Sequence, residues 1–329
     1  MIFDNIRRKV FSIMLFALLV LLLLYMRDLF FDIPDAVKWV KWRNSAVTGF
    51  PDILSGRLSM LISIVMTLIA GMLIYKIGFD HLSITGREHL LVWLWVIQVG
   101  GLSFLHPLSE VHFATVFILL SYDALFGIYR KAVDYDGIFI SSMYLGIATF
   151  FYSFSIYLFI PYMISLYRFK IAGFRDWIIS IAGFLVPFYF AIFIYHFWGE
   201  SWLYPVETTI KNIVPDGLST GIAEMTVSQY VFCMFVFSLI AVEMLMHIKL
   251  MRQGMSQKTI SCMRSFSALM LFSTLVFLLF TPESKLMIQI IFVPATIYLR
   301  ILFVKIKRNI IANILFLLLI AISIVTLLY

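Results

Sequence analysis

The feature that most constrains this chain is a series of long apolar runs separated by short polar stretches. The runs are about 16 to 20 residues long, and at 1.5 Å per residue this is the helix length that crosses a hydrocarbon core of about 30 Å. Hydrophobic residues make up 62% of the 329 and charged residues only 13%, against about 25% charged in soluble domains. We therefore predict an all-α, polytopic transmembrane helical bundle, with residues 1–329 forming a single integral membrane domain.

About eleven helices are expected. We place them near 10–26, 58–75, 89–104, 113–129, 136–152, 154–167, 177–197, 229–247, 265–280, 285–303 and 310–328. The first run ends in Tyr25, Met26 and Arg27 and lacks a small-residue cleavage pattern, so we interpret it as a retained helix and not as a signal peptide. One interpretation of the pair at 136–167 is a single hairpin that turns at Ser153.

The basic residues indicate the orientation, because they concentrate on the cytoplasmic side of membrane proteins. With the N-terminus in the cytoplasm and the C-terminus in the periplasm, the cytoplasmic side receives Arg7, Arg8, Lys9, Lys76, Arg87, Arg130, Lys131, Arg168, Lys170, Arg175, Lys249, Arg252, Lys258, Arg264, Lys305, Lys307 and Arg308. Only seven basic residues fall outside: Arg27, Lys38, Lys41, Arg43, Arg57, Lys211 and Lys285. We read the net charge of +7 as a signal of topology in a bacterial inner membrane, and we expect no nucleic-acid partner.

Two stretches, at about 27–57 and 198–228, are long enough to form outer-face loops. In the first, Trp39, Lys41 and Arg43 are typical of a segment in the membrane interface, with indole rings at headgroup level and basic groups near phosphates. An interfacial anchor is one interpretation. The other adds the carboxylates Asp32 and Asp35 as groups that meet a lipid-linked substrate. The second stretch, with two prolines and three glycines, is predicted to be an irregular cap carrying Glu200, Glu207, Asp216 and Glu224.

The turn between the third and fourth predicted helices reads HPLSEVH and contains His106, Glu110 and His112. Histidine and carboxylate can bind a divalent metal or transfer a proton. The spacing matches no zinc signature, so an ordinary interfacial turn stands beside a ligand-binding site. His196 and Glu200 close the seventh segment on the same face and are candidates to join this group.

Ionisable and amide side chains within the predicted spans are costly there and need partners. Asp123 lies two turns from Arg130, and Glu243 one turn before His247, so we expect both acids to pair or to extend toward water near the cytoplasmic boundary. Gln98, Gln289 and Arg300 need polar partners that the sequence does not identify. Cys233 and Cys262 support neither a disulfide framework nor a zinc site.

Residues 136–198 carry a family resemblance. The features are Gly137 and Gly146 on one helix, the turn Phe151, Tyr152 and Ser153, the helix start Phe174, Arg175, Asp176 and Trp177, and Gly183 with Pro187. This stretch resembles an uncharacterised polytopic membrane protein family of Bacteroidota.

The same stretch is similar in outline to the polyprenyl-phosphate-sugar-dependent glycosyltransferases of the GT-C class. The matching residues are Gly137, Gly146, Ala148, Arg168, Lys170 and Arg175. In that class an acidic residue of the first outer loop activates the acceptor hydroxyl, and Asp32 or Asp35 occupies the corresponding place. The chain lacks the consecutive acidic pair after the first helix and the large outer domain that many such enzymes possess.

The resemblance implies a GT-C-like enzyme of cell-envelope glycan handling. Asp35 or Asp32 would be the general base, and His106, Glu110 and His112 would orient the donor phosphate directly or through Mg²⁺ or Mn²⁺. Trp39, Lys41 and Arg43 would hold the polyprenyl-phosphate carrier among the membrane lipids. Two alternatives stay open, a non-enzymatic scaffold or assembly subunit of an envelope export complex with membrane protein partners, and a lipid or solute transporter.

Overall fold

The computed structural model describes residues 2–30, 57–82, 89–129, 134–171, 173–197, 204–213, 225–250, 256–279, 285–306 and 309–328. Within these residues the chain is helical and contains no β-strand. The α-helices are α1 (Ile2–Phe30), α2 (Arg57–Asp80), α3 (His89–Gly100), α4 (Glu110–Gly127), α5 (Tyr135–Phe151), α6 (Phe159–Arg168), α7 (Phe174–Phe197), α8 (Tyr204–Ile213), α9 (Val227–Leu250), α10 (Gln257–Leu279), α11 (Met287–Lys305) and α12 (Asn309–Leu328). The short 3₁₀ helix η3 (Ser103–Leu105) lies between α3 and α4, and η4 (Ser153–Leu158) lies between α5 and α6.

The membrane-bundle prediction is confirmed. Among the described residues, six helices are long and apolar enough to cross a membrane, namely α2, α4, α7, α10, α11 and α12. Shorter apolar stretches lie in three further helices, at Ser12–Met26, His89–Gly100 and Val227–Val242. Each of the eleven predicted segments corresponds to a helix, and the chain is a multi-pass α-helical membrane protein.

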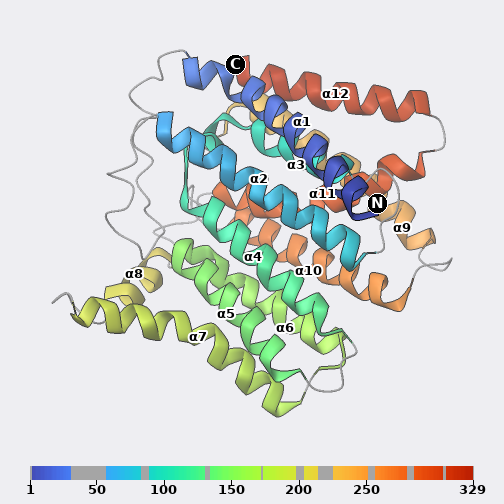
Figure 1. Ribbon diagram of the computed structural model, residues 1–329. Coiled ribbons are helices and arrows are strands. Elements are labelled where there is room, and N and C mark those ends of the chain that lie inside the picture. Colours follow the sequence, from blue (N-terminus) through green and yellow to red (C-terminus); the bar gives the residue numbers. More distant parts are fainter. Residues whose placement is uncertain are drawn as a thin grey trace.

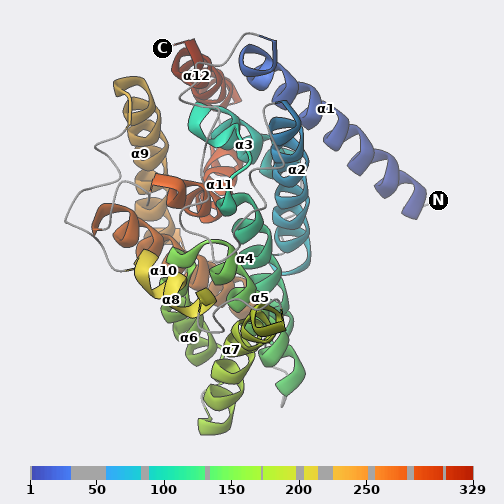
Figure 2. The same cartoon turned by 90° about the vertical axis from the view of Figure 1, so that its left-hand side faces the viewer.

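The helices lie side by side, with α1 and α12 at one edge of the bundle and α7 with α8 at the other (Figure 1). The described chain begins and ends at opposite ends of the bundle. In the view turned by 90°, the N-terminal end of α1 stands apart from the other helices (Figure 2). α11 is the central helix, because 94% of its apolar window is buried, against 28% for α7 and α12.

The second outer stretch differs from its prediction. Residues 204–213 form the helix α8, where an irregular cap was expected. The reason is local. Pro205 lies in the first turn of α8, where a backbone N–H would have no acceptor within the helix, so a proline without an N–H is tolerated there. The prolines and glycines of this stretch therefore flank and begin a short amphipathic helix, which packs against α7 and η4.

The third segment also differs from its prediction. We expected a span over 89–104, but α3 ends at Gly100, and its 12 residues give a length of about 18 Å. The chain then continues through Gly101–Ser109 in irregular backbone and η3, largely buried. Non-helical backbone at membrane depth is tolerated where protein groups satisfy its hydrogen bonds. This segment therefore needs hydrogen-bond partners from the helices around it.

Candidate functional site

Side chains from three helices satisfy the irregular backbone between α3 and α4. The hydroxyls of Tyr25 on α1 and Ser63 on α2 both donate to the carbonyl oxygen of Leu105, each over 3.4 Å. Thr326 on α12 donates to the carbonyl oxygen of Gly101 over 2.6 Å, and the N–H of Leu108 donates to Ser59 Oγ over 2.9 Å. The segment is thus tied to the N-terminal half of the bundle and to its last helix.

His112 lies at the centre of these contacts, in the first turn of α4. The N–H of Ser109, which precedes α4, donates to Nδ1 of His112 over 3.3 Å, and Ser109 Oγ lies 3.0 Å from the same nitrogen. Because a backbone N–H can only donate, Nδ1 accepts and the ring is neutral with its proton on Nε2. Nε2 then donates to Ser63 Oγ over 3.0 Å, so both ring nitrogens are used within the protein.

His106 is held by a different set of contacts. Its ring stacks on Tyr25, with ring centroids 3.9 Å apart and an interplanar angle of 23°. Its Nε2 donates to the carbonyl oxygen of Gly100 over 2.9 Å, and this oxygen is one of those left without a helical partner where α3 ends. We call Tyr25, Ser63, His106, Ser109 and His112 the α4 N-terminal cluster.

The three predicted ligand-binding residues do lie in this one region, but inside the protein. His106 is 0% exposed, and Glu110 and His112 are each 1% exposed. Their binding role stays a prediction. Within the described residues, no group of three or more His, Cys, Asp or Glu side chains is placed to hold a metal ion, and the Mg²⁺ or Mn²⁺ ion also stays a prediction.

Several predicted residues lie outside the described part of the chain. They are Asp32, Asp35, Trp39, Lys41 and Arg43 of the first outer stretch, and Glu200, Asp216 and Glu224 of the second. Glu207 is exposed on α8. The side chains of Glu243 and His247 are likewise not described.

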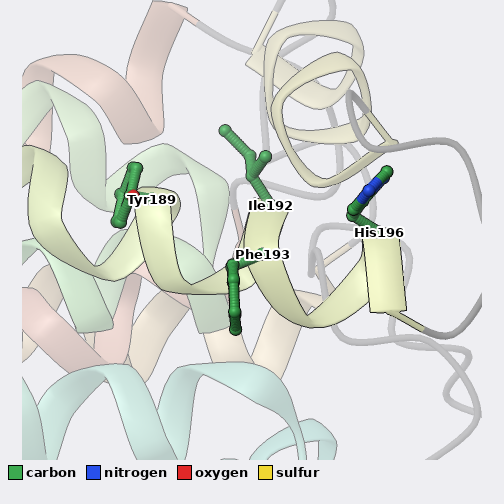
Figure 3. A pocket seen from close by; sticks show the side chains of 4 residues that line it. All are labelled: Tyr189, Ile192, Phe193 and His196. Carbon is green, nitrogen blue, oxygen red and sulfur yellow. The ribbon is translucent and has the colours of Figure 1, made fainter.

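His196 does not join the α4 N-terminal cluster. It lies at the exposed end of α7, at the opposite edge of the bundle from α1 (Figure 1). Together with Tyr189, Ile192 and Phe193 it lines a shallow depression of about 330 Å³ (Figure 3). All four of these side chains come from α7, and the lining is mainly apolar.

A charged cluster lies at the other end of α2 and α4. Asp123 accepts hydrogen bonds from Lys76 Nζ over 2.7 Å and from His81 Nε2 over 3.0 Å. The Asp123 side chain is 14% exposed whereas that of Lys76 is 55% exposed, so the lysine extends from the helix toward the outside of the bundle. Asp123 is thus paired, as expected, with Lys76 on α2 and with His81, which directly follows α2; they lie 47 and 42 residues away in the sequence.

Tyr25, Ser63 and Ser109 were not predicted as site residues. A tyrosine and two serines carry little signal by themselves, since hydroxyls in membrane helices often bond to their own backbone. The available signal was indirect: Gly100 and Gly101, followed by Pro107, indicate an early end to α3, and a broken helix needs hydrogen-bonding groups nearby.

The fold and these two clusters define an integral membrane protein with polar groups concentrated at both ends of α2 and α4. Comparison of the chain with protein-family models, curated proteins and solved structures gave no match.

Proposed function

We propose that this protein acts on cell-envelope glycans in the bacterial inner membrane, transferring a sugar from a polyprenyl-phosphate carrier at the outer face. One observation carries the proposal. The stretch that contains Asp32 and Asp35 leaves α1 after Phe30 and enters α2 at Arg57, and each of these helices contributes a hydroxyl to the α4 N-terminal cluster.

The helix geometry gives the distance, along the helix axes, between the ends of the acidic stretch and the α4 N-terminal cluster. Tyr25 lies five residues before the end of α1, and Ser63 lies six residues after the start of α2. At 1.5 Å per residue, both ends of the acidic stretch are within about 9 Å of the cluster along the helix axes. The two helix ends that flank the acidic stretch, Phe30 and Arg57, are therefore at the same end of the bundle as His106, Glu110 and His112.

The residues have distinct roles in this proposal. Asp35, or alternatively Asp32, takes the proton from the acceptor hydroxyl as its oxygen attacks the anomeric carbon of the sugar, while the bond from that carbon to the phosphate oxygen breaks and polyprenyl phosphate leaves. Trp39, Lys41 and Arg43 hold the lipid carrier at the interface. His112 uses both ring nitrogens within the protein, so its role is to position Ser63 and the start of α2. His106 and Glu110 would orient the donor phosphate, directly or through Mg²⁺ or Mn²⁺.

The test is incorporation of labelled sugar into envelope glycans by cells that carry single variants. A general base contributes about 10²–10⁴ in rate, so Asp35→Asn should reduce incorporation at least a hundredfold at unchanged expression. Glu207→Gln removes an exposed carboxylate on α8 and is the matched control, with incorporation expected to stay at the wild-type level. Wild-type incorporation in Asp35→Asn, Asp32→Asn and their double variant would rule the catalytic proposal out.

A non-enzymatic subunit of an envelope export complex is the second candidate. The observation that favours it is that His106 and His112 bond within the protein and are buried, as structural residues are. Mild solubilisation followed by purification separates the two candidates: a stoichiometric membrane protein partner favours the subunit, and a co-purifying polyprenyl lipid favours the enzyme.

A further inference from the structure

The central helix α11 carries a line of polar residues through the interior of the bundle. Gln289, Thr296 and Arg300 are spaced by seven and four residues, which places them on one face of a helix. Their exposed fractions are 1%, 0% and 4%. Pro294 interrupts the same helix and has no N–H, so the carbonyl of Ile290 lacks the partner that a regular helix would provide.

α3 packs against α11 and adds one more polar residue to this region. Gln98 is 0% exposed, and its Oε1 accepts a hydrogen bond from Thr296 Oγ1 over 3.4 Å. Its Nε2 has no hydrogen-bond partner in the described part of the protein, and the same holds for Oε1 of Gln289. One of these atoms is a donor and the other an acceptor.

Unmade hydrogen bonds of buried amides are costly, and buried polar groups in folded proteins are nearly always paired. A serine or threonine can bond to the carbonyl one turn earlier in its own helix, as Thr296 does with Phe292. Nε2 of Gln98, a donor, and Oε1 of Gln289, an acceptor, make no hydrogen bond of any kind within the described residues. Water both donates and accepts, and it commonly satisfies such groups in protein interiors.

We propose that water binds inside the bundle along α11, at Nε2 of Gln98, which lies beside Thr296, and at Oε1 of Gln289, seven residues before Thr296 on the same helix face. The site lies in the membrane domain and is separate from the α4 N-terminal cluster in its residues. It makes one face of α11 polar and hydrated, while the rest of that helix packs in apolar surroundings. This inference is independent of the proposed transferase activity.

Cysteine accessibility in membranes tests the site. Thr296→Cys and Gln98→Cys are made in a chain whose Cys233 and Cys262 are replaced by alanine, and each is treated with 2-aminoethyl methanethiosulfonate. Ala295→Cys and Ile297→Cys are matched controls, because these positions flank Thr296, are 0% and 1% exposed, and point to other faces of α11. We expect the two test positions to react at least tenfold faster than the controls. Equal, slow reaction at all four positions would overturn the proposal.

A second measurement covers the case in which the cysteine variants do not fold. Gln289→Met replaces the amide by an apolar side chain of similar size. If Oε1 were unpaired in a dry core, this change would raise the thermal midpoint in detergent, because a costly group is removed. With water bound there, we expect the midpoint to fall. A rise of the midpoint would contradict the proposal, whatever the labelling result.

Discussion

At the scale of single residues, this protein uses its buried polar side chains mainly to satisfy backbone groups. Tyr25, Ser63 and Thr326 all donate to carbonyls of the irregular segment that follows α3. His112 connects this segment to α4 through Ser109. In a bilayer no water is available for such carbonyls, so each side chain replaces a solvent contact that a soluble loop would make.

Removing the His112 ring should therefore destabilise the protein. His112→Ala leaves the N–H of Ser109 without its acceptor and removes one of the hydrogen bonds of Ser63 Oγ, and a buried polar group left unsatisfied costs about 1–3 kcal/mol. We expect a fall in the thermal midpoint in detergent of at least about 3 °C. His196→Ala, the same substitution at an exposed position of α7, is the control and should leave the midpoint nearly unchanged. Similar midpoints for the two variants would show that the His112 bonds do not stabilise the fold.

At the scale of helices, the close crossing of α5 and α7 depends on two glycines. A Cβ atom at Gly146 would overlap the carbonyl oxygen of Phe184, and one at Gly183 would overlap Ser142 Oγ and lie 2.6 Å from the carbonyl oxygen of Phe139. Small residues allow helix backbones to approach in membranes, where packing and not hydrophobic burial drives helix association. These glycines hold the exposed, aromatic-rich α7 on the bundle.

The crossing can be tested by adding one methyl group at each site. Gly146→Ala and Gly183→Ala should lower the thermal midpoint, because α7 must move away from α5 to make room. Gly127→Ala is the matched control at the end of α4, where a Cβ would meet nothing within 4 Å. It should be neutral or slightly stabilising, since alanine favours a helix more than glycine does. If all three variants have the same thermal midpoint, close contact between α5 and α7 is not required for stability.

At the scale of the whole molecule, the helices alternate in direction, and the described chain begins and ends at opposite ends of the bundle (Figure 1). Ser63 and His112 meet at one end of α2 and α4, while Lys76 and Asp123 meet at the other. These two helices therefore run in the same direction, as a chain that returns through α3 requires.

The absolute orientation is a prediction from the basic residues. Single cysteines at Ser45, Ser219 and Ser256, in a chain lacking Cys233 and Cys262, should report it. An impermeant maleimide applied to intact spheroplasts should label the first two positions and spare Ser256, which precedes α10. Labelling only at Ser256 would reverse the orientation and place the α4 N-terminal cluster on the cytoplasmic side.

The sequence by itself determined the class of protein and the position of nearly every helix along the chain. The physical reason is that a bilayer allows a crossing segment to satisfy its backbone only within itself, so an apolar run of sufficient length has to be helical. The exceptions are informative. α8 is too short and too polar to register as a span, and the early end of α3 depends on partners supplied by α1, α2 and α12.

Only the tertiary structure decided which polar residues meet. The contacts of Ser63 with His112, and of Lys76 with Asp123, join residues 49 and 47 positions apart. Each depends on the rotation of two helices about their axes. In soluble proteins an apolar stripe along the sequence indicates that rotation, but membrane helices are apolar on all sides, facing lipid outward and other helices inward. The rotation is instead set by the fit of many side chains along each interface, such as the glycines between α5 and α7, and this fit exists only once the bundle is assembled.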